Sequence, residues 1–196
     1  MLRRSLTLSV VALLVLVIAA SASATLVRVR VEGKSQTIFG ASQPRALATN
    51  ALGALEAASI GGEFYYHVQE TAFGPYVDQI GRYLGAGSGG WVFKVNGVSP
   101  PVGADKVALR DGDVVLWYWA TFTDKGGPAT LELAREQNGC YRAVARDDAG
   151  KAVPANPVLR VDGRRVSMRL GSACPGPHRG LVRATAPDAV RSNALR

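Results

Sequence analysis

The sequence predicts an α+β fold in two parts: a first domain with a sheet and one helix, then a smaller all-β domain. Two observations carry this prediction. Residues 25–122 combine strand patterns of period two with a single stretch of helical period. Residues 129–196 hold only short strand patterns separated by turn residues, which is typical of a small β-sandwich. The polar, Gly-rich segment 123–128 is predicted to be the linker.

The segment 1–24 is predicted to be a signal peptide. An Arg pair at 3–4 is followed by an apolar run at 10–20 and by Ala-Ser-Ala at 22–24, a small-x-small pattern typical of a secretory cleavage site. Cleavage is expected after Ala24. An uncleaved membrane anchor is the alternative, but the apolar run is shorter than the roughly 20 residues that a spanning helix needs. We therefore expect a secreted or cell-surface protein without an integral membrane segment in the mature chain.

The net charge of the chain is +8, and it is about +6 without the Arg pair at 3–4. The arginines are scattered along the sequence and form no dense run, so no specific nucleic-acid partner is expected. Weak attraction to anionic cell-wall polymer or lipid head groups needs only net charge.

Two strands rich in aromatic and β-branched residues, Trp91–Val95 and Val114–Trp119, form the predicted centre of the first domain. In the first strand, Trp91 and Phe93 share one face and Lys94 lies on the other, because a strand has a period of two residues. The second strand is apolar on both faces. It is therefore predicted to be the central strand of a sheet that is covered on both sides.

The elements before these strands complete the first domain. The patterns predict a strand at 25–31, a short return strand at 36–39, a helix at 42–62 and a third strand at 63–68. The helix would carry Pro44 in its first turn and stop at a Gly pair. Residues 74–80 are predicted to be irregular. A hairpin, a helix and further strands that end in a central one are the order of a β-grasp domain.

Four segments of the first domain also resemble a known family. They are Phe-Gly-Pro-Tyr-Val-Asp-Gln-Ile at 73–80, Gly-Trp-Val-Phe-Lys-Val-Asn-Gly at 90–97, Gly-Ala at 103–104 and Leu-Arg-Asp-Gly-Asp-Val at 109–114. Over about residues 25–122 the sequence resembles a bacterial domain of unknown function that is related to the C-terminal domain of transcobalamin and intrinsic factor. In transcobalamin-like proteins this domain closes over one face of cobalamin.

The resemblance implies a ligand face at Trp91, Phe93 and Asn96, with cobalamin as the candidate ligand. A second interpretation stays open. A Trp on such a strand is commonly a core residue, and Asn96-Gly97 is a common hairpin turn.

No catalytic or metal site is predicted. The Gly-rich segment 85–90 fits the glycine spacing of dinucleotide-binding loops, but it opens a strand and not a helix. Ser88 lacks the strand-to-helix turn of a hydrolase nucleophile for the same reason. Asp111 and Asp113 are too few for a calcium site, and His67 is expected to pack or to end a strand. The protein is predicted not to be an enzyme.

Strands of the second domain are predicted at 131–135, 141–145, 158–161, 166–170 and 181–184. Cys140 and Cys174 are expected to form a disulfide, since paired cysteines of an exported chain usually do. A redox or metal pair is the alternative, with His178 as the only obvious third ligand.

Segments of the second domain, at 147–154, 161–163 and 183–192, resemble bacterial immunoglobulin-like and carboxypeptidase-regulatory-like modules. The usual last strand of such a module would follow Arg191. Either this strand is very short or the module is incomplete.

These predictions describe an exported, non-catalytic binding protein. Its first domain would bind a small molecule, with cobalamin named, or an extracellular partner. The alternative is a structural or adhesion protein of the cell surface, in which both domains are spacers and Trp91 is part of the core.

Overall fold

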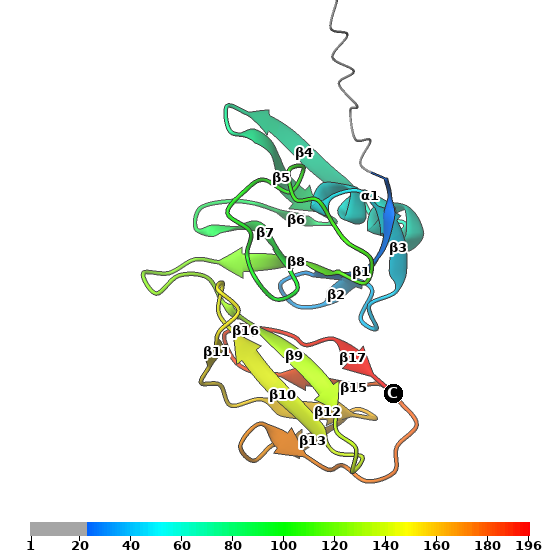
Figure 1. Cartoon of the computed structure of the whole chain (residues 1–196). Helices are drawn as coiled ribbons and strands as arrows, with labels where there is room; N and C mark the ends of the chain where they lie inside the picture. Colours follow the sequence, from blue (N-terminus) through cyan, green and yellow to red (C-terminus); the bar gives the residue numbers. More distant parts are fainter. Residues whose placement is uncertain (1–22) are drawn as a thin grey trace, which may run out of the picture.

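The computed structural model describes residues 23–196, so the predicted signal segment lies almost entirely outside the described residues. The described chain is mostly β-structure with one helix. Figure 1 shows two units, one above the other, which we call the N-terminal unit (residues 25–122) and the C-terminal unit (residues 129–196). Within 23–196, no helix has the length and apolar character needed to cross a membrane.

A mixed sheet with strand order β2-β1-β8-β7 organises the N-terminal unit, and β3 also pairs with β1. Strand β8 runs parallel to β1 and antiparallel to β7. It is therefore internal, as predicted. The elements of this unit are β1 (Thr25–Glu32), β2 (Thr37–Phe39), β3 (Arg45–Ala48), α1 (Ala51–Gly62), β4 (Tyr66–Thr71), β5 (Gly74–Ile80), β6 (Tyr83–Leu84), β7 (Gly89–Val95) and β8 (Val114–Thr121).

One face of this sheet packs against α1, which lies on the side away from the C-terminal unit (Figure 1). The strand period places the valines of β1, Trp91 of β7 and Trp117 of β8 on this face, where all are buried with Leu55 of the helix. This cluster is the core of the N-terminal unit.

The helix begins later than predicted. Asn50 caps it by accepting a hydrogen bond from the Gly53 backbone N–H at 2.8 Å. The prediction of a helical first turn at Pro44 was wrong, because residues 45–48 form β3, which pairs antiparallel with β1. Ladder hydrogen bonds to β1 outweighed the helical spacing, and Leu47 is left exposed.

Beside this layer lies a small sheet of order β4-β5-β6. The predicted third strand is displaced, since β4 covers 66–71 and not 63–68. Residues 74–80, predicted to be irregular, form β5. Pro75 and Gly74 obscured this strand in the sequence, because Pro cannot donate a ladder hydrogen bond and is rare inside strands.

The C-terminal unit contains two sheets, of order β11-β10-β9-β16 (with β14 on β10) and β13-β12-β15-β17. Both contribute to one buried cluster that includes Leu133, Tyr141 and Leu159. The disulfide between Cys140 and Cys174 is present. The strands are β9 (Ala129–Arg135), β10 (Tyr141–Arg146), β11 (Ala152–Val153), β12 (Val158–Val161), β13 (Arg164–Ser167), β14 (Ser172–Ala173), β15 (Val182–Thr185), β16 (Ala189–Val190) and β17 (Ala194–Leu195).

The C-terminal unit covers the second face of the main sheet. Leu116, Tyr118 and Ala120 of β8 form a separate buried cluster with Val190, and Val92 packs against it. The apolar character of β8 on both faces therefore has two causes: α1 and the core on one side, and the C-terminal unit on the other.

Candidate functional site

An aromatic cavity of about 360 Å³ lies along β7. Trp91, Phe93 and Trp117 line it from one face of the sheet, and Val92 and Tyr118 from the other. Since the lining comes from both faces, the cavity lies at the edge of the sheet. Its other walls are Pro75, Tyr76 and Val77 of β5, the segment 99–104 with Ser99, Pro100, Gly103 and Ala104, then Phe122 and Asp148.

Trp91 is a core residue with one side at this cavity. Only 2% of its surface is exposed, and its indole Nε1 donates a hydrogen bond to the Tyr83 carbonyl at 2.8 Å. Its ring packs edge-on against Trp119, with the ring centroids 5.8 Å apart. The polar atom of the indole is already bonded within the protein, so Trp91 can offer a ligand only the small apolar part of its ring that reaches the cavity.

Phe93 is half-buried and stacks on Trp117, with the ring centroids 5.1 Å apart. Tyr76 and Phe122 stand at the rim, each with 43% of its surface exposed. Phe122 follows directly after β8. In the sequence, its role at the cavity could have been suspected from an aromatic residue placed just beyond the end of a buried strand. Tyr76 was missed as a site residue because its strand was not predicted.

Asn96 does not belong to this cavity. It occupies the turn after β7 with φ of 52°, a conformation that Asn tolerates well. Its Oδ1 accepts a hydrogen bond from the Val114 N–H at 2.9 Å, and its Nδ2 donates to Asp113 Oδ1 at 2.7 Å. The structure thus brings Trp91 and Phe93 together at the cavity and places Asn96 in the turn directly after β7, where its side chain bonds to the beginning of β8.

The outer edge of β7 presents main-chain groups beside the cavity. The Asn96 N–H donates to the Val114 carbonyl, and the Phe122 N–H donates to the Ser88 carbonyl. Hydrogen-bonded and non-hydrogen-bonded residue pairs alternate along an antiparallel ladder, so the main-chain N–H and C=O groups of the even-numbered residues from 88 to 96 point toward β8. The main-chain N–H and C=O of Trp91 and Phe93 consequently point away from β8. In the sheet containing β7, β8 is its single neighbouring strand. This edge can therefore hydrogen-bond to an added group.

Polar groups close one end of the aromatic cavity. Tyr118 Oη and Ser99 Oγ both donate to Asp148 Oδ1, at 3.3 and 3.2 Å. Burial, and then the negative charge of Asp148, raise the pKa of Tyr118. Lys94 lies nearby with no exposed surface, donating to Thr130 and to the carbonyl of Asp147, and burial lowers its pKa. These contacts hold the C-terminal unit against the face of the main sheet that carries Lys94 and Tyr118.

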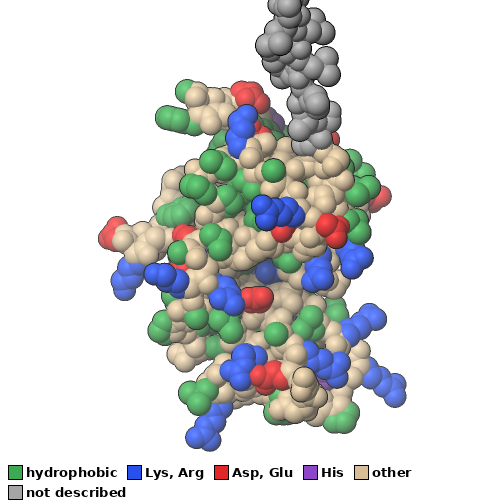
Figure 2. Space-filling model, viewed as in Figure 1, with side chains coloured by type: hydrophobic (Ala, Val, Ile, Leu, Met, Phe, Trp, Pro, Cys, Tyr) green, Lys and Arg blue, Asp and Glu red, His purple; other side chains and the backbone are tan. Residues whose placement is uncertain are grey.

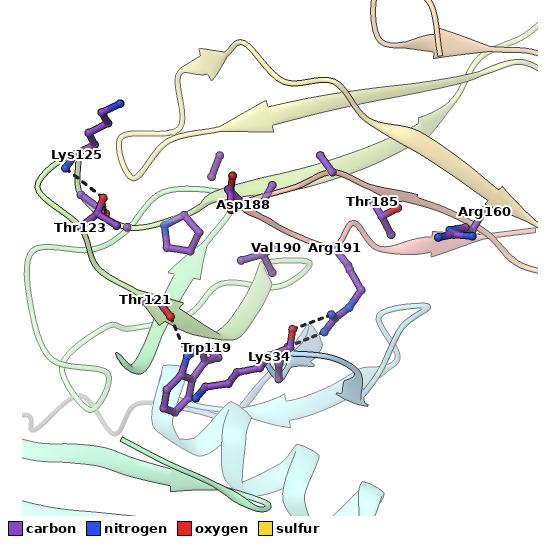
Figure 3. Close-up of a pocket in the computed structure, with 17 residues that line it drawn as sticks. Lys34, Trp119, Thr121, Thr123, Lys125, Arg160, Thr185, Asp188, Val190 and Arg191 are labelled. Atoms are coloured by element: carbon purple, nitrogen blue, oxygen red, sulfur yellow. Dashed lines mark hydrogen bonds between the residues drawn. The ribbon is translucent and has the colours of Figure 1, made fainter. Parts of the chain in front are cut away.

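A larger cavity, of about 920 Å³, lies between the two units and is drawn in Figure 3. Lys34 extends over the ring of Trp119, with Nζ 4.2 Å from the ring centroid. All three guanidinium nitrogens of Arg191 are bonded to Glu32 or to the carbonyls of Gly33 and Lys34. Arg191 is therefore part of the contact between the units.

The remaining candidates lie apart from these cavities. His67 Nδ1 is 2.7 Å from Asp78 Oδ1 on the neighbouring strand, and His178 Nε2 is 2.8 Å from Tyr141 Oη. Asp113 Oδ2 accepts from the Arg110 N–H, which is a turn contact. Among residues 23–196, no group of three or more His, Cys, Asp or Glu side chains is arranged to hold a metal ion.

Comparison with known proteins gives a family match for part of the chain. Residues 49–121 match a domain of unknown function (DUF4430). No curated protein matches. Among solved structures, one similar chain is described as a "putative metal binding protein" from Ruminococcus gnavus ATCC 29149. It is 14% identical, the alignment covers 48% of this chain and 95% of that one, and the TM-score is 0.36.

Proposed function

We propose that this protein is an exported, non-catalytic binding protein whose aromatic cavity takes up a small molecule. The observation that carries the proposal is the position of the cavity: the rings of Trp91, Phe93 and Trp117 form an apolar wall beside main-chain groups that point away from β8. Ligand sites are typically apolar cavities with a few placed polar groups, and 360 Å³ lies within their usual range of about 300–1,000 Å³.

The ligand that fits this wall has an apolar body and amide groups that can pair with the edge of β7. A corrinoid such as cobalamin has this chemistry, because amide side arms surround its macrocycle. A complete corrinoid is larger than the cavity. Cobalamin would therefore insert an arm or one edge of the ring and leave its remaining surface outside.

The topology supports the finer fold interpretations. A β1–β2 hairpin, a helix and a central strand parallel to β1 are the arrangement expected of a β-grasp domain. Two sheets around one core support an immunoglobulin-like module in the C-terminal unit. Strand β17 has two residues and pairs antiparallel with β15. The proposed relation to the transcobalamin C-terminal domain rests on the sequence segments quoted above.

Export is supported by the disulfide, since structural disulfides persist in oxidising compartments. The non-catalytic role is supported by the surroundings of Ser88. This serine lies in a turn that leads into β7, in place of the strand-to-helix turn of a hydrolase. A hydrolytic activity that is abolished by Ser88→Ala would contradict this part of the proposal.

The test is a fluorescence titration of the purified protein with two probes. One is cobalamin, followed by tryptophan quenching with correction for its own absorbance. The other is N-phenyl-1-naphthylamine, a neutral dye whose emission rises in apolar surroundings. We expect saturable binding, weakened about tenfold in Phe122→Ala or Tyr76→Ala, which corresponds to the loss of about 1.4 kcal/mol of aromatic contact.

Phe73→Ala is the matched control, because Phe73 is fully exposed and does not line the cavity. Trp91→Ala is the poorer variant, since it would remove a buried core residue and weaken the fold. Saturable binding of the dye without cobalamin would support the cavity and reject the corrinoid. No saturable binding of either probe would contradict the proposal and favour the structural or adhesion role.

A further inference from the structure

A buried charged cluster joins the two units, and its charges do not balance. Glu32, with no exposed surface, accepts hydrogen bonds from Arg30, Arg183 and Arg191. Each of these arginines also forms an ion pair with Glu32. Three guanidinium groups thus surround one carboxylate. Coulomb repulsion among the arginines opposes this arrangement, and a further negative charge nearby would relieve it.

Arg30 is the least satisfied member of this cluster. Its side chain is almost completely buried, and its hydrogen bonds, to Glu32 and to the Arg191 carbonyl, both come from Nη1. Its buried Nε has no hydrogen-bond partner within the described chain. Burial lowers the pKa of Arg30 to about 10, so the group is still protonated at neutral pH. A buried donor without an acceptor is costly, and native structures rarely keep one without a reason.

Arg30 also lines a second cavity between the units, of about 480 Å³. Arg28 lines it as well, two residues earlier on the same face of β1, and Gln43 adds an amide. Figure 2 shows a recess between the two units with Lys or Arg atoms in it and around it. Arg28 makes no side-chain hydrogen bond or ion pair with residues 23–196 and is exposed.

The other charged residues at this cavity already have partners. Arg146 donates to Glu132 at 2.9 Å and to the Gly150 carbonyl, and Arg135 donates to the Arg196 carbonyl. Glu132 is the single acidic residue of the lining, and its charge is offset by Arg146. Arg28, which has no side-chain partner within residues 23–196, and Arg30, whose buried Nε has none, are the two cations of this cavity that stand on the same face of β1.

We propose that this cavity between the units binds an oxyanion, a carboxylate or a phosphate group, through Arg28 and Arg30. The planar guanidinium matches the geometry of both anions, and a charge-assisted hydrogen bond to a buried donor is stronger than a neutral one. The site is separate from the aromatic cavity, so it does not depend on the proposed function. Neither the fold nor the family match assigns it.

The experiment is calorimetric titration of the full protein with inorganic phosphate and, separately, with acetate, at an ionic strength held constant with NaCl. Saturable binding is expected for at least one of the two anions. The anion with the lower dissociation constant identifies the class, phosphate or carboxylate. Arg28→Gln should weaken it about tenfold, the effect of losing one charge-assisted contact. Because Arg28 is exposed, this variant is expected to fold.

Arg164→Gln is the matched control, since Arg164 is an exposed arginine on β13 and does not line the cavity. It removes the same net charge and should leave the dissociation constant unchanged. The proposal is overturned if neither anion binds saturably. It is also overturned if Arg28→Gln and Arg164→Gln weaken binding equally, which would mean that net charge alone attracts the anion.

Discussion

Individual buried polar side chains hold the two units together. Glu32 and Lys94 have no exposed surface, yet they lie on the face of the main sheet that the C-terminal unit covers. Each is compensated by partners far along the chain: Arg183 and Arg191 for Glu32, and Thr130 for Lys94. Such groups are costly to bury, and removing one partner leaves the others uncompensated.

Glu32→Gln tests whether the charged cluster stabilises the folded protein. The substitution removes the negative charge that compensates three arginines, so we expect the free energy of unfolding to fall by about 3–5 kcal/mol. Urea denaturation followed by tryptophan fluorescence measures it. Glu70→Gln, at an exposed position on β4, is the control and should change little. A loss below about 1 kcal/mol for Glu32→Gln would show that the cluster is not a stabilising contact.

Tyr118 gives a prediction about alkaline pH. Burial raises its pKa in the folded state above the ordinary value of 10.0. The unfolded chain therefore releases the proton first as the pH rises, and stability that is complete below pH 10 is lost above it. This group alone should cost roughly 1.4 kcal/mol for each pH unit above 10.

The comparison is between the wild type and Tyr118→Phe, with urea denaturation from pH 8 to pH 11. The variant should lose less stability than the wild type above pH 10, whatever the other groups contribute to both proteins. Tyr65→Phe, at an exposed tyrosine, should follow the wild type. Parallel curves for wild type and Tyr118→Phe would contradict the shifted pKa of Tyr118.

At the scale of the element, strands with a clear period were predictable from the sequence and locally ambiguous segments were not. The alternation in β7 correctly separated Trp91 and Phe93 from Lys94. The apolar run in β8 predicted its internal position. Residues 45–48 were assigned to the helix because their spacing fits either structure, and only pairing with β1 decides between them.

The candidate site was predictable only where it coincides with these strands. Trp91 and Phe93 line the aromatic cavity, but Asn96 serves the turn. Tyr76, Pro100 and Asp148 reach the cavity from three segments whose approach depends on the tertiary fold. The pairing of Glu32 with Arg183 and Arg191 also had no local signal, because more than 150 residues separate the partners.

The disulfide supports the strands of the C-terminal unit. It joins Cys140, next to β10, to Cys174, next to β14, across a sequence separation of 34 residues. Replacing both cysteines by alanine should lower the free energy of unfolding by about 3–4 kcal/mol, from the entropy regained by the unfolded chain. Far-UV circular dichroism should follow the urea transition, since all three tryptophans lie in the N-terminal unit. An unchanged transition midpoint would show that the sheets hold without the disulfide.

At the scale of the whole molecule, the two units share an extensive interface. An apolar cluster around Tyr118, the charged cluster around Glu32 and the buried Lys94 all lie between them. The aromatic cavity is open at the edge of β7 and is closed at one end by Asp148 of the C-terminal unit. The C-terminal unit therefore contributes directly to the proposed ligand site, beyond covering the sheet.

The three tryptophans provide the most direct measurement of the proposed ligand site. Trp91 and Trp117 line the aromatic cavity, whereas Trp119 lines the large cavity between the units. Proton–nitrogen NMR resolves the indole N–H of each during a titration with N-phenyl-1-naphthylamine. We predict that the Trp91 and Trp117 signals shift together, saturably and with one dissociation constant, and that the Trp119 signal shifts less. Unmoved Trp91 and Trp117 signals, or a largest shift at Trp119, would contradict this prediction.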